Sequence, residues 1–310
     1  MRGVRTHGLI RLPTYVDKLA SGEYNPTPRM RWSRRPGVIH LDADDAMGQI
    51  AAARAIDAAC EMAAAQPSVL CFGTRLGHLG AVGGFALRAA RRGFFAVVMQ
   101  RTPPMMGLPG YRGPVIGNSP LAFASPVPGS APIVFDMACS VAARGHVLMA
   151  RQNGDPIPAG WTLDRHGEPT IDAEEAASGL LLPTGGHKGL GLAMMVECLA
   201  GSLAAVAGRP VAPAPPTLGA GASGGQNAFF WVVNPALAGD ADGFAASMLA
   251  WTTHVREAGG PAARLPGERA ERQAREARAH GVPIRREVVS ALRVLGERVG
   301  VGMPAARDRG

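Results

Sequence analysis

Residues 6–15 read THGLIRLPTY, and no other stretch says as much about the fold and chemistry of this chain. His7, Arg11 and Tyr15 lie four residues apart, so on a helix they would share one face. Such a face presents an imidazole, a guanidinium and a phenol. These groups suit an anionic substrate that exchanges protons. Pro13 predicts a kink in this helix. The spacing alone also fits a solvated surface helix with three unrelated polar groups.

Further short motifs follow the first one in a fixed order. They are 77–80 (GHLG), 117–124 (GNSPLAFA), 136–138 (DMA), 154–164 (GDPIPAGWTLD), 185–192 (GGHKGLGL) and 266–268 (PGE). Together with THGLIRLPTY they span about 260 residues. In sequence and order they resemble the malate/L-lactate dehydrogenase family of non-Rossmann NAD(P)-dependent oxidoreductases. That family includes ureidoglycolate dehydrogenase, sulfolactate dehydrogenase and cyclic imine carboxylate reductases.

The resemblance implies an α/β fold that is not of the Rossmann type, with a helical part built from both chain ends. We expect a helical substrate-binding region over 1–36, a cofactor-binding and catalytic α/β core over 37–239, and a helical region over 240–310. Relatives usually carry further helical residues ahead of the first motif. We therefore expect a shortened N-terminus that leaves Leu9, Ile10 and Leu12 exposed.

Hydrophobic periodicity predicts strands over 68–74, 94–100, 133–136 and 229–233, and helices over 51–65, 83–92, 240–258, 267–280 and 285–299. The apolar run 190–206 contains Glu197 and two glycines, so it is interpreted as a packed core helix and not as a membrane span. The Pro-, Gly- and Ala-rich stretch 207–225 is expected to be a loop.

The net charge of +8 comes from 32 Lys and Arg against 24 Asp and Glu, without long basic blocks. Diffuse basicity and an aromatic content of 5% argue against nucleic-acid binding. A general positive field would attract small dianions and a dinucleotide. The cysteines lie in apolar sequence without C-x-x-C pairs and are expected to be buried and reduced. No apolar leader begins the chain, so we expect a cytoplasmic protein without a membrane partner.

His78 is the candidate catalytic residue, since it follows a predicted strand between two small residues, Gly77 and Gly80. On sequence alone, a histidine that merely caps a loop fits as well. His78 matches the catalytic histidine of the family, which implies that it gives a proton to the substrate oxygen. We expect its loss of a proton to lower the rate of reduction as the pH rises. Leu79 and the Arg75-Leu76 pair depart from the family pattern, which predicts a different pocket shape.

The family resemblance assigns the first motif to the substrate. Arg11 would hold a carboxylate, and His7 would bind the reacting oxygen or assist the proton transfer. Tyr15 and Thr6 complete this substrate-binding set, and Thr6 keeps the hydroxyl of the usual serine.

Residues at the start of the predicted apolar helix are candidates for cofactor binding. Free backbone N–H groups, the helix dipole and Lys188 would favour an anion there, although a glycine turn for close packing is the alternative interpretation. The resemblance implies that the cofactor contacts one further set of residues, which is Thr102, Asn118, Asp136, Met137, Ala138, His187, Lys188 and Gly189. Asp136 would accept hydrogen bonds from ribose hydroxyls.

The literal G-x-G-x-x-G pattern at 219–224 is not interpreted as a dinucleotide fingerprint, because it leads into a strand and not into a helix. No metal-binding motif is present, so no metal is expected. The resemblance implies hydride transfer between NAD or NADP and a small 2-hydroxy or 2-oxo carboxylate, in a homodimer with its active site near the subunit boundary. Two alternatives remain, which are a cyclic imine carboxylate reductase of the same family and a truncated remnant that binds cofactor without turnover.

Overall fold

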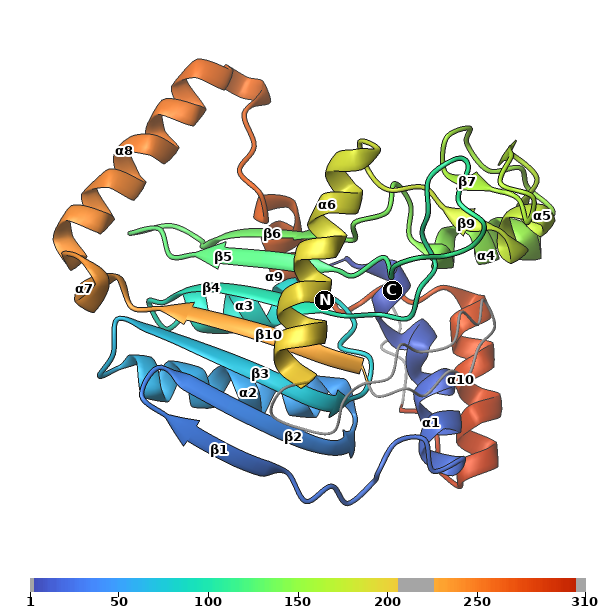
Figure 1. The fold of residues 1–310 in the computed structure, drawn as a ribbon, viewed down its shortest axis with the longest axis horizontal. Coiled ribbons are helices and arrows are strands. Elements are labelled where there is room, and N and C mark those ends of the chain that lie inside the picture. Colours follow the sequence, from blue (N-terminus) through green and yellow to red (C-terminus); the bar gives the residue numbers. More distant parts are fainter. Residues whose placement is uncertain (1–2, 206–225, 305–310) are drawn as a thin grey trace.

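A mixed sheet of seven strands forms the centre of the computed structural model, which describes residues 3–205 and 226–304. The spatial order is β1-β2-β3-β10-β4-β5-β6 (Figure 1). The strands span Arg31–Arg35 (β1), Val38–Ala46 (β2), Ser68–Leu76 (β3), Phe95–Gln100 (β4), Leu121–Ser125 (β5), Ile133–Met137 (β6) and Gln226–Val233 (β10). This sheet and the helices around it confirm the expected α/β class.

The strand directions bring several chain segments to one edge of the sheet. Only β2 and β3 are parallel neighbours, and each of the other neighbouring pairs is antiparallel. Because β10 runs antiparallel between β3 and β4, those two strands point the same way. By the same count β2, β3, β4 and β6 all end at one edge, where β5 and β10 begin. The residues that follow β3, β4 and β6 therefore lie together, as ligand-binding residues do at the carboxyl ends of strands.

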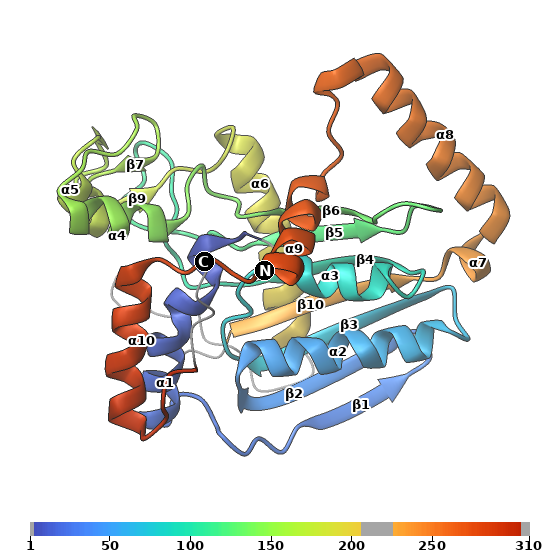
Figure 2. The same cartoon turned by 180° about the vertical axis from the view of Figure 1, so that it is seen from behind.

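Helices cover both faces of the sheet. α2 (Gly48–Ala63) and α3 (Gly83–Ala90) lie on one face, and α6 (His187–Val196) crosses the other (Figures 1 and 2). A π-helical stretch, Glu197–Leu203, continues α6. Val196 at the end of α6 and Ala200 of this stretch pack in one apolar cluster with Phe229 of β10. The apolar run that was predicted as a core helix is therefore a core element.

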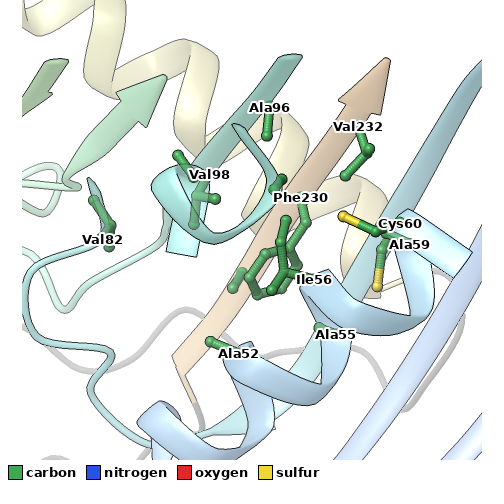
Figure 3. Packing of buried hydrophobic residues seen from close by; sticks show 14 of the residues in the cluster. Ala52, Ala55, Ile56, Ala59, Cys60, Val82, Ala96, Val98, Phe230 and Val232 are labelled. Carbon is green, nitrogen blue, oxygen red and sulfur yellow. The ribbon is translucent and has the colours of Figure 1, made fainter. Parts of the chain in front are cut away.

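The main core lies between the sheet and α2. Alanines along α2 allow the helix to approach the sheet closely, and Ile56 packs there among the side chains of β10 and β4 (Figure 3). Phe230 of β10 is fully buried at 0% exposure and fills the space that the small side chains leave. The alternate residue Trp231 points to the other face and is partly exposed.

A smaller layer stands beside the main sheet. It contains a three-stranded sheet in the order β8-β7-β9, with strands Pro169–Thr170 (β8), Thr162–Leu163 (β7) and Leu180–Leu181 (β9), and the helices α4 (Arg144–Asn153) and α5 (Ala173–Ser178). Its own apolar cluster includes Met106, Leu181 and Leu190. Leu190 belongs to α6, so this helix contacts both layers.

The two chain ends form a helical part, as expected. α1 (Leu12–Ala20) lies beside α10 (Arg286–Val299) in both views, and Arg298 binds Asp17 at 2.6 Å (Figures 1 and 2). α9 (Glu268–His280) follows the short helix η4 (Gly260–Ala262). α7 (Pro235–Ala238) leads into α8 (Ala241–Gly259), which extends away from the body of the molecule (Figure 1).

The predicted continuous helix through the first motif is wrong. His7 ends one 3₁₀ turn, η1 (Arg5–His7), and Arg11 ends another, η2 (Leu9–Arg11), before α1 begins. Pro13 occupies the first turn of α1, where its missing N–H costs nothing, so it begins the helix and causes no kink. The apolar residues Leu9, Ile10 and Leu12 are exposed, as the sequence predicted.

Other local expectations had mixed outcomes. β1, β2 and β5 were not predicted as strands, because β1 reads RWSRR and β2 ends in acidic residues. Cys60, Cys71 and Cys139 are buried free thiols, whereas Cys198 is exposed, contrary to expectation. Its position on the outer side of the π-helical stretch explains this difference. The loop 207–225 and the glycine pattern within it lie outside the described residues.

In the parts of the chain that the structure describes, none of the helices has both the length and the apolar character needed to cross a membrane.

Candidate active site

His78 lies two residues beyond the end of β3, at the shared edge of the sheet. Leu76 and Leu79 on either side of it are buried in the main core, so they fix the loop. The different pocket shape that the sequence predicts stays a prediction. The backbone N–H of His78 donates to Tyr24 Oη at 3.0 Å, and its Nδ1 is hydrogen-bonded to Tyr15 Oη at 2.9 Å. Both the backbone and the ring of His78 are therefore held by tyrosines from the first chain segment.

The structure brings the residues of the first motif to His78. The His7 ring stacks on the His78 ring with 5.4 Å between their centroids. Thr6 Oγ1 is hydrogen-bonded to His7 Nδ1 at 2.8 Å, and Arg11 Nε donates to the Thr6 carbonyl at 3.0 Å. The residues cluster because the two 3₁₀ turns fold back on α1, although they do not share a helix face.

Burial and positive neighbours keep both imidazoles neutral at physiological pH. Desolvation, followed by repulsion from the neighbouring His7 ring and from the cations Arg11 and Lys18, lowers the pKa of His78 to about 3. Desolvation, with Arg11 and His146, lowers the pKa of His7 to about 4. A second proton on His78 near neutral pH is therefore disfavoured in the site without an anion, and the expected fall of the reduction rate with rising pH stays a prediction. Burial also raises the pKa of Tyr15, so the phenol keeps its proton.

Three of the expected cofactor-binding residues, Thr102, Asn118 and Gly189, are joined by one series of hydrogen bonds. Thr102 Oγ1 donates to Asn118 Oδ1 at 3.0 Å and accepts from the Ser119 N–H at 3.1 Å. The series then runs through three backbone bonds of 2.8 Å each, which are Cys139 N–H to Asn118 O, Thr184 N–H to Cys139 O and Gly189 N–H to Thr184 O. Thr102, Asn118 and Gly189 thus belong to one continuous part of the sheet edge, and Ala138 immediately precedes Cys139 of this series.

Asp136 and Met137 lie at the end of β6 beside this series. Asp136 Oδ2 accepts from the Gly83 N–H at 2.8 Å, so one carboxylate oxygen holds the start of α3. Asp136 is nevertheless exposed to solvent, whereas Met137 and Ala138 are half-buried.

The start of α6 differs from its expected form. The Lys188 N–H donates to the Gly185 carbonyl at 3.3 Å and the Gly189 N–H to Thr184, so fewer backbone donors are free than the sequence suggested. His187 and Lys188 are both exposed on the first turn, and Gly186 before them has a φ of +62°. An anion at this helix start would depend mainly on the Lys188 ammonium and the helix dipole.

These residues fit a dinucleotide. The exposed ammonium of Lys188 suits a phosphate or ribose, and the exposed carboxylate of Asp136 suits ribose hydroxyls. Ser119 is fully buried and its Oγ has no hydrogen-bond partner among the described residues, which leaves a polar group beside Thr102 and Asn118. Groups of three or more His, Cys, Asp or Glu side chains that could hold a metal are absent from residues 3–205 and 226–304.

Sequence reasoning missed two residues that contact the His78 loop, which are Tyr24 and Gln100. No sequence signal indicates Tyr24, whereas Gln100 is a polar residue that ends an apolar strand. The unusual Arg75 also has a local explanation. Its guanidinium binds the carboxylates of Asp42, Asp44 and Asp45 at 2.8 to 2.9 Å, so it joins the end of β3 to the end of β2.

The chain is similar in sequence to known proteins. A family model described as malate/L-lactate dehydrogenase matches residues 1–293. A (2R)-3-sulfolactate dehydrogenase (NADP(+)) of Chromohalobacter salexigens is 37% identical over 201 residues, which are 65% of this chain and 60% of that protein. A ureidoglycolate dehydrogenase (NAD(+)) of Escherichia coli K12 is 37% identical over 236 residues, covering 76% of this chain and 66% of the relative. The matched part thus spans about 60 to 66% of these curated relatives.

Solved structures share the fold over nearly the whole chain. The crystal structure of Δ1-piperideine-2-carboxylate reductase from Pseudomonas syringae pvar. tomato superposes with a TM-score of 0.83 at 29% identity. The match covers 95% of this chain and 88% of that one.

The lowered pKa values of the two histidines predict a loss of stability in acid. The unfolded chain takes up protons near pH 6.5, whereas folded His7 and His78 stay neutral down to about pH 4 and 3. The free energy of unfolding should therefore fall below pH 6.5 by up to about 1.4 kcal/mol per pH unit for each histidine. Urea unfolding between pH 7.5 and 5 measures this slope.

The matched control for the pH prediction is the exposed His254. His78→Gln should flatten the dependence of the unfolding free energy on pH, and His254→Gln should leave it as in the wild type. Equal slopes for the wild type and His78→Gln would show that His78 is not neutral in the folded protein.

Proposed function

The chain belongs to the malate/L-lactate dehydrogenase family, and we propose that it transfers a hydride between NAD or NADP and a small 2-hydroxy or 2-oxo carboxylate. One observation carries the proposal. The bond between Tyr15 and His78, with Arg11 close by, lies at the same sheet edge as the series from Thr102 to Gly189. Proton-exchanging groups and polar groups for a dinucleotide are thus neighbours. The relatives act on carboxylates of this kind, as their names state.

The residues of the cluster divide the chemistry among them. In the site without substrate, Tyr15 donates to Nδ1 of neutral His78, so the Nε2–H is left to face the substrate oxygen. His78 gives a proton to that oxygen from its imidazolium form, which returns it to the neutral ring. Arg11 binds the substrate carboxylate, and Thr6 with His7 orients the reacting group. The bound nicotinamide supplies the hydride. Thr102, Asn118, Asp136, Met137, Ala138, His187, Lys188 and Gly189 hold the cofactor.

Binding of an anion changes the charge around His78. The positive charge of Arg11 contributes to the low pKa of His78 and His7. A substrate carboxylate beside Arg11 would offset this charge and raise both pKa values. The site therefore gains affinity for a proton when an anionic substrate enters, which is when the reduction needs one.

A second candidate function is the reduction of a cyclic imine carboxylate. The structural likeness to Δ1-piperideine-2-carboxylate reductase favours it. A cyclic imine acid also presents a carboxylate for Arg11 and an electrophilic carbon for hydride. The same site residues serve both reactions, so the choice of substrate has to be measured.

We further propose a cytoplasmic homodimer. The free cysteines are consistent with a reducing compartment. α8 stands away from the body of the molecule, and its Leu249 and Trp251 are about half exposed at 52% and 50% (Figure 2). A second copy would cover this apolar surface.

The dimer predicts a mass in solution of twice 32.1 kDa. Light scattering coupled to size exclusion measures it. Trp251→Glu places a charge on the apolar surface of α8 and should shift the protein toward the monomer. A wild-type protein that stays monomeric at micromolar concentration would refute this assembly.

The proposed reaction predicts oxidation of NADH or NADPH in the presence of pyruvate, oxaloacetate or a cyclic imine acid. His78→Gln should lower kcat by about 10²–10⁴-fold, the contribution of a positioned acid, and leave the cofactor Kd unchanged. The exposed His254→Gln serves as the control and should keep full activity. Cofactor binding without turnover by the wild type on any of these substrates would support the non-catalytic alternative.

Lys188→Ala tests the cofactor-binding end of the site. Loss of a charged hydrogen bond to the cofactor should weaken NAD(P)H binding by about 1–3 kcal/mol, measured by fluorescence titration. Lys188→Arg keeps the charge and should lose less affinity than Lys188→Ala. An unchanged Kd in Lys188→Ala would remove this residue from the cofactor site.

A further inference from the structure

The side-chain amide of Gln100 holds both sides of the loop that carries His78. Gln100 is the last residue of β4 and has 0% exposure. Its Oε1 accepts from the Leu79 N–H at 3.0 Å, and its Nε2 donates to the Gly77 carbonyl at 3.0 Å. The two bonds therefore reach the residue before His78 and the residue after it.

This amide replaces strand pairing where the pairing stops. β3 ends at Leu76, and the Gly77 N–H still donates to the carbonyl of Ala46 in β2 at 2.9 Å. Beyond that bond, the Gly77 carbonyl and the Leu79 N–H are bound by the Gln100 side chain and not by a strand. The Gln100 amide offers one acceptor and one donor, as a peptide unit of a neighbouring strand would. Buried backbone groups need such partners, because an unsatisfied one costs about 1–3 kcal/mol. His78 can thus leave the sheet with its backbone still fixed.

Gln100 also belongs to the cofactor side of the sheet edge. Its own N–H donates to the Pro120 carbonyl at 3.0 Å, and Ala228 of β10 pairs with it. Two residues later, Thr102 holds Asn118 at 3.0 Å. One residue therefore connects the His78 loop with the segment at Thr102 and Asn118 through short, buried hydrogen bonds.

We propose that Gln100 is a positioning residue that fixes His78 relative to the bound cofactor. The inference rests on the proposed hydride-transfer function and deepens it. Hydride and proton must reach neighbouring atoms of one substrate, so the imidazole and the nicotinamide need a fixed separation. Gln100 sets this separation because both of its ends are engaged and no solvent competes for them.

Gln100→Glu gives a signature that loss of stability alone would not produce. A protonated Glu keeps the shape and can donate to the Gly77 carbonyl, whereas an ionised Glu cannot. Burial raises the pKa of such a carboxyl, so the donor form persists toward neutral pH. The ratio of kcat in Gln100→Glu to kcat in the wild type should fall about 10- to 100-fold at pH 8.5 and recover as the pH drops to 6. The KM for substrate and the Kd for NAD(P)H should change less than threefold.

Gln100→Met and a double mutant show whether the effect passes through His78. Gln100→Met has a similar volume but makes neither bond, and its kcat should be low at every pH. In a His78→Gln background, Gln100→Met should cause no further loss, because a residue that acts only through His78 has nothing left to position. Thr252→Val is the matched control, since it also removes a buried side-chain hydrogen bond but in α8, and its kcat should stay at the wild-type value.

The outcomes separate this inference from the proposed function. Two results with an active wild type would overturn the role of Gln100 and leave the proposed function standing. One is a kcat of Gln100→Glu that stays at a constant fraction of the wild-type value across the pH range. The other is fully additive losses of kcat in the double mutant. A wild type that is inactive on all substrates would overturn the function. Hydrogen exchange of the backbone amides in residues 77–80 would then still test whether the Gln100 side chain holds this loop. Gln100→Met should speed this exchange at least tenfold, and an unchanged rate would refute it.

Discussion

The position of β10 between β3 and β4 is the constraint on which the site depends. A strand from residues 226–233 separates two strands that lie more than a hundred residues earlier in the chain, and its antiparallel pairing makes them point the same way. Their carboxyl ends then place His78 and Thr102 at one edge of the sheet. If β10 were parallel to one of these strands and antiparallel to the other, β3 and β4 would point in opposite directions. Their carboxyl ends would then lie at opposite edges of the sheet. The chemistry of this edge thus follows from strand direction before any side chain is considered.

Local sequence pattern predicted the elements that are apolar along their whole length. The strands at SVLCFGT and FFWVV and the alanine-rich helix α2 follow from periodicity, because each buries a continuous apolar surface. β1 could not be predicted in this way, since it is an edge strand whose arginines remain in solvent. The insertion of β10 between β3 and β4 was also out of reach, because strand pairing over such a separation leaves no local signal.

Residues of the candidate site could be predicted where they belong to a sequence motif, and not where only a contact in the folded chain reveals them. THGLIRLPTY and GHLG indicated His7, Arg11, Tyr15 and His78, and the structure brings these side chains together. Tyr24 and Gln100 contact the same loop from 54 and 21 residues away, and a lone tyrosine or glutamine has no spacing that reveals a role. The helix expected for the first motif failed for a related reason. Pro13 is compatible with a helix start and with a kink alike, and in the structure α1 begins at Leu12, so Pro13 lies in its first turn.

Electrostatics gives the site a preference for anions that geometry alone would not. Two stacked imidazoles are buried next to Arg11, and burial disfavours a second proton on either ring. Among the described residues, no ion pair neutralises the charge of Arg11. A neutral ligand would bring no charge to balance Arg11. An anionic ligand balances it and at the same moment makes the imidazolium form less costly. In the function proposed here, affinity for a carboxylate and readiness to supply a proton would therefore be two results of one arrangement of charge and burial.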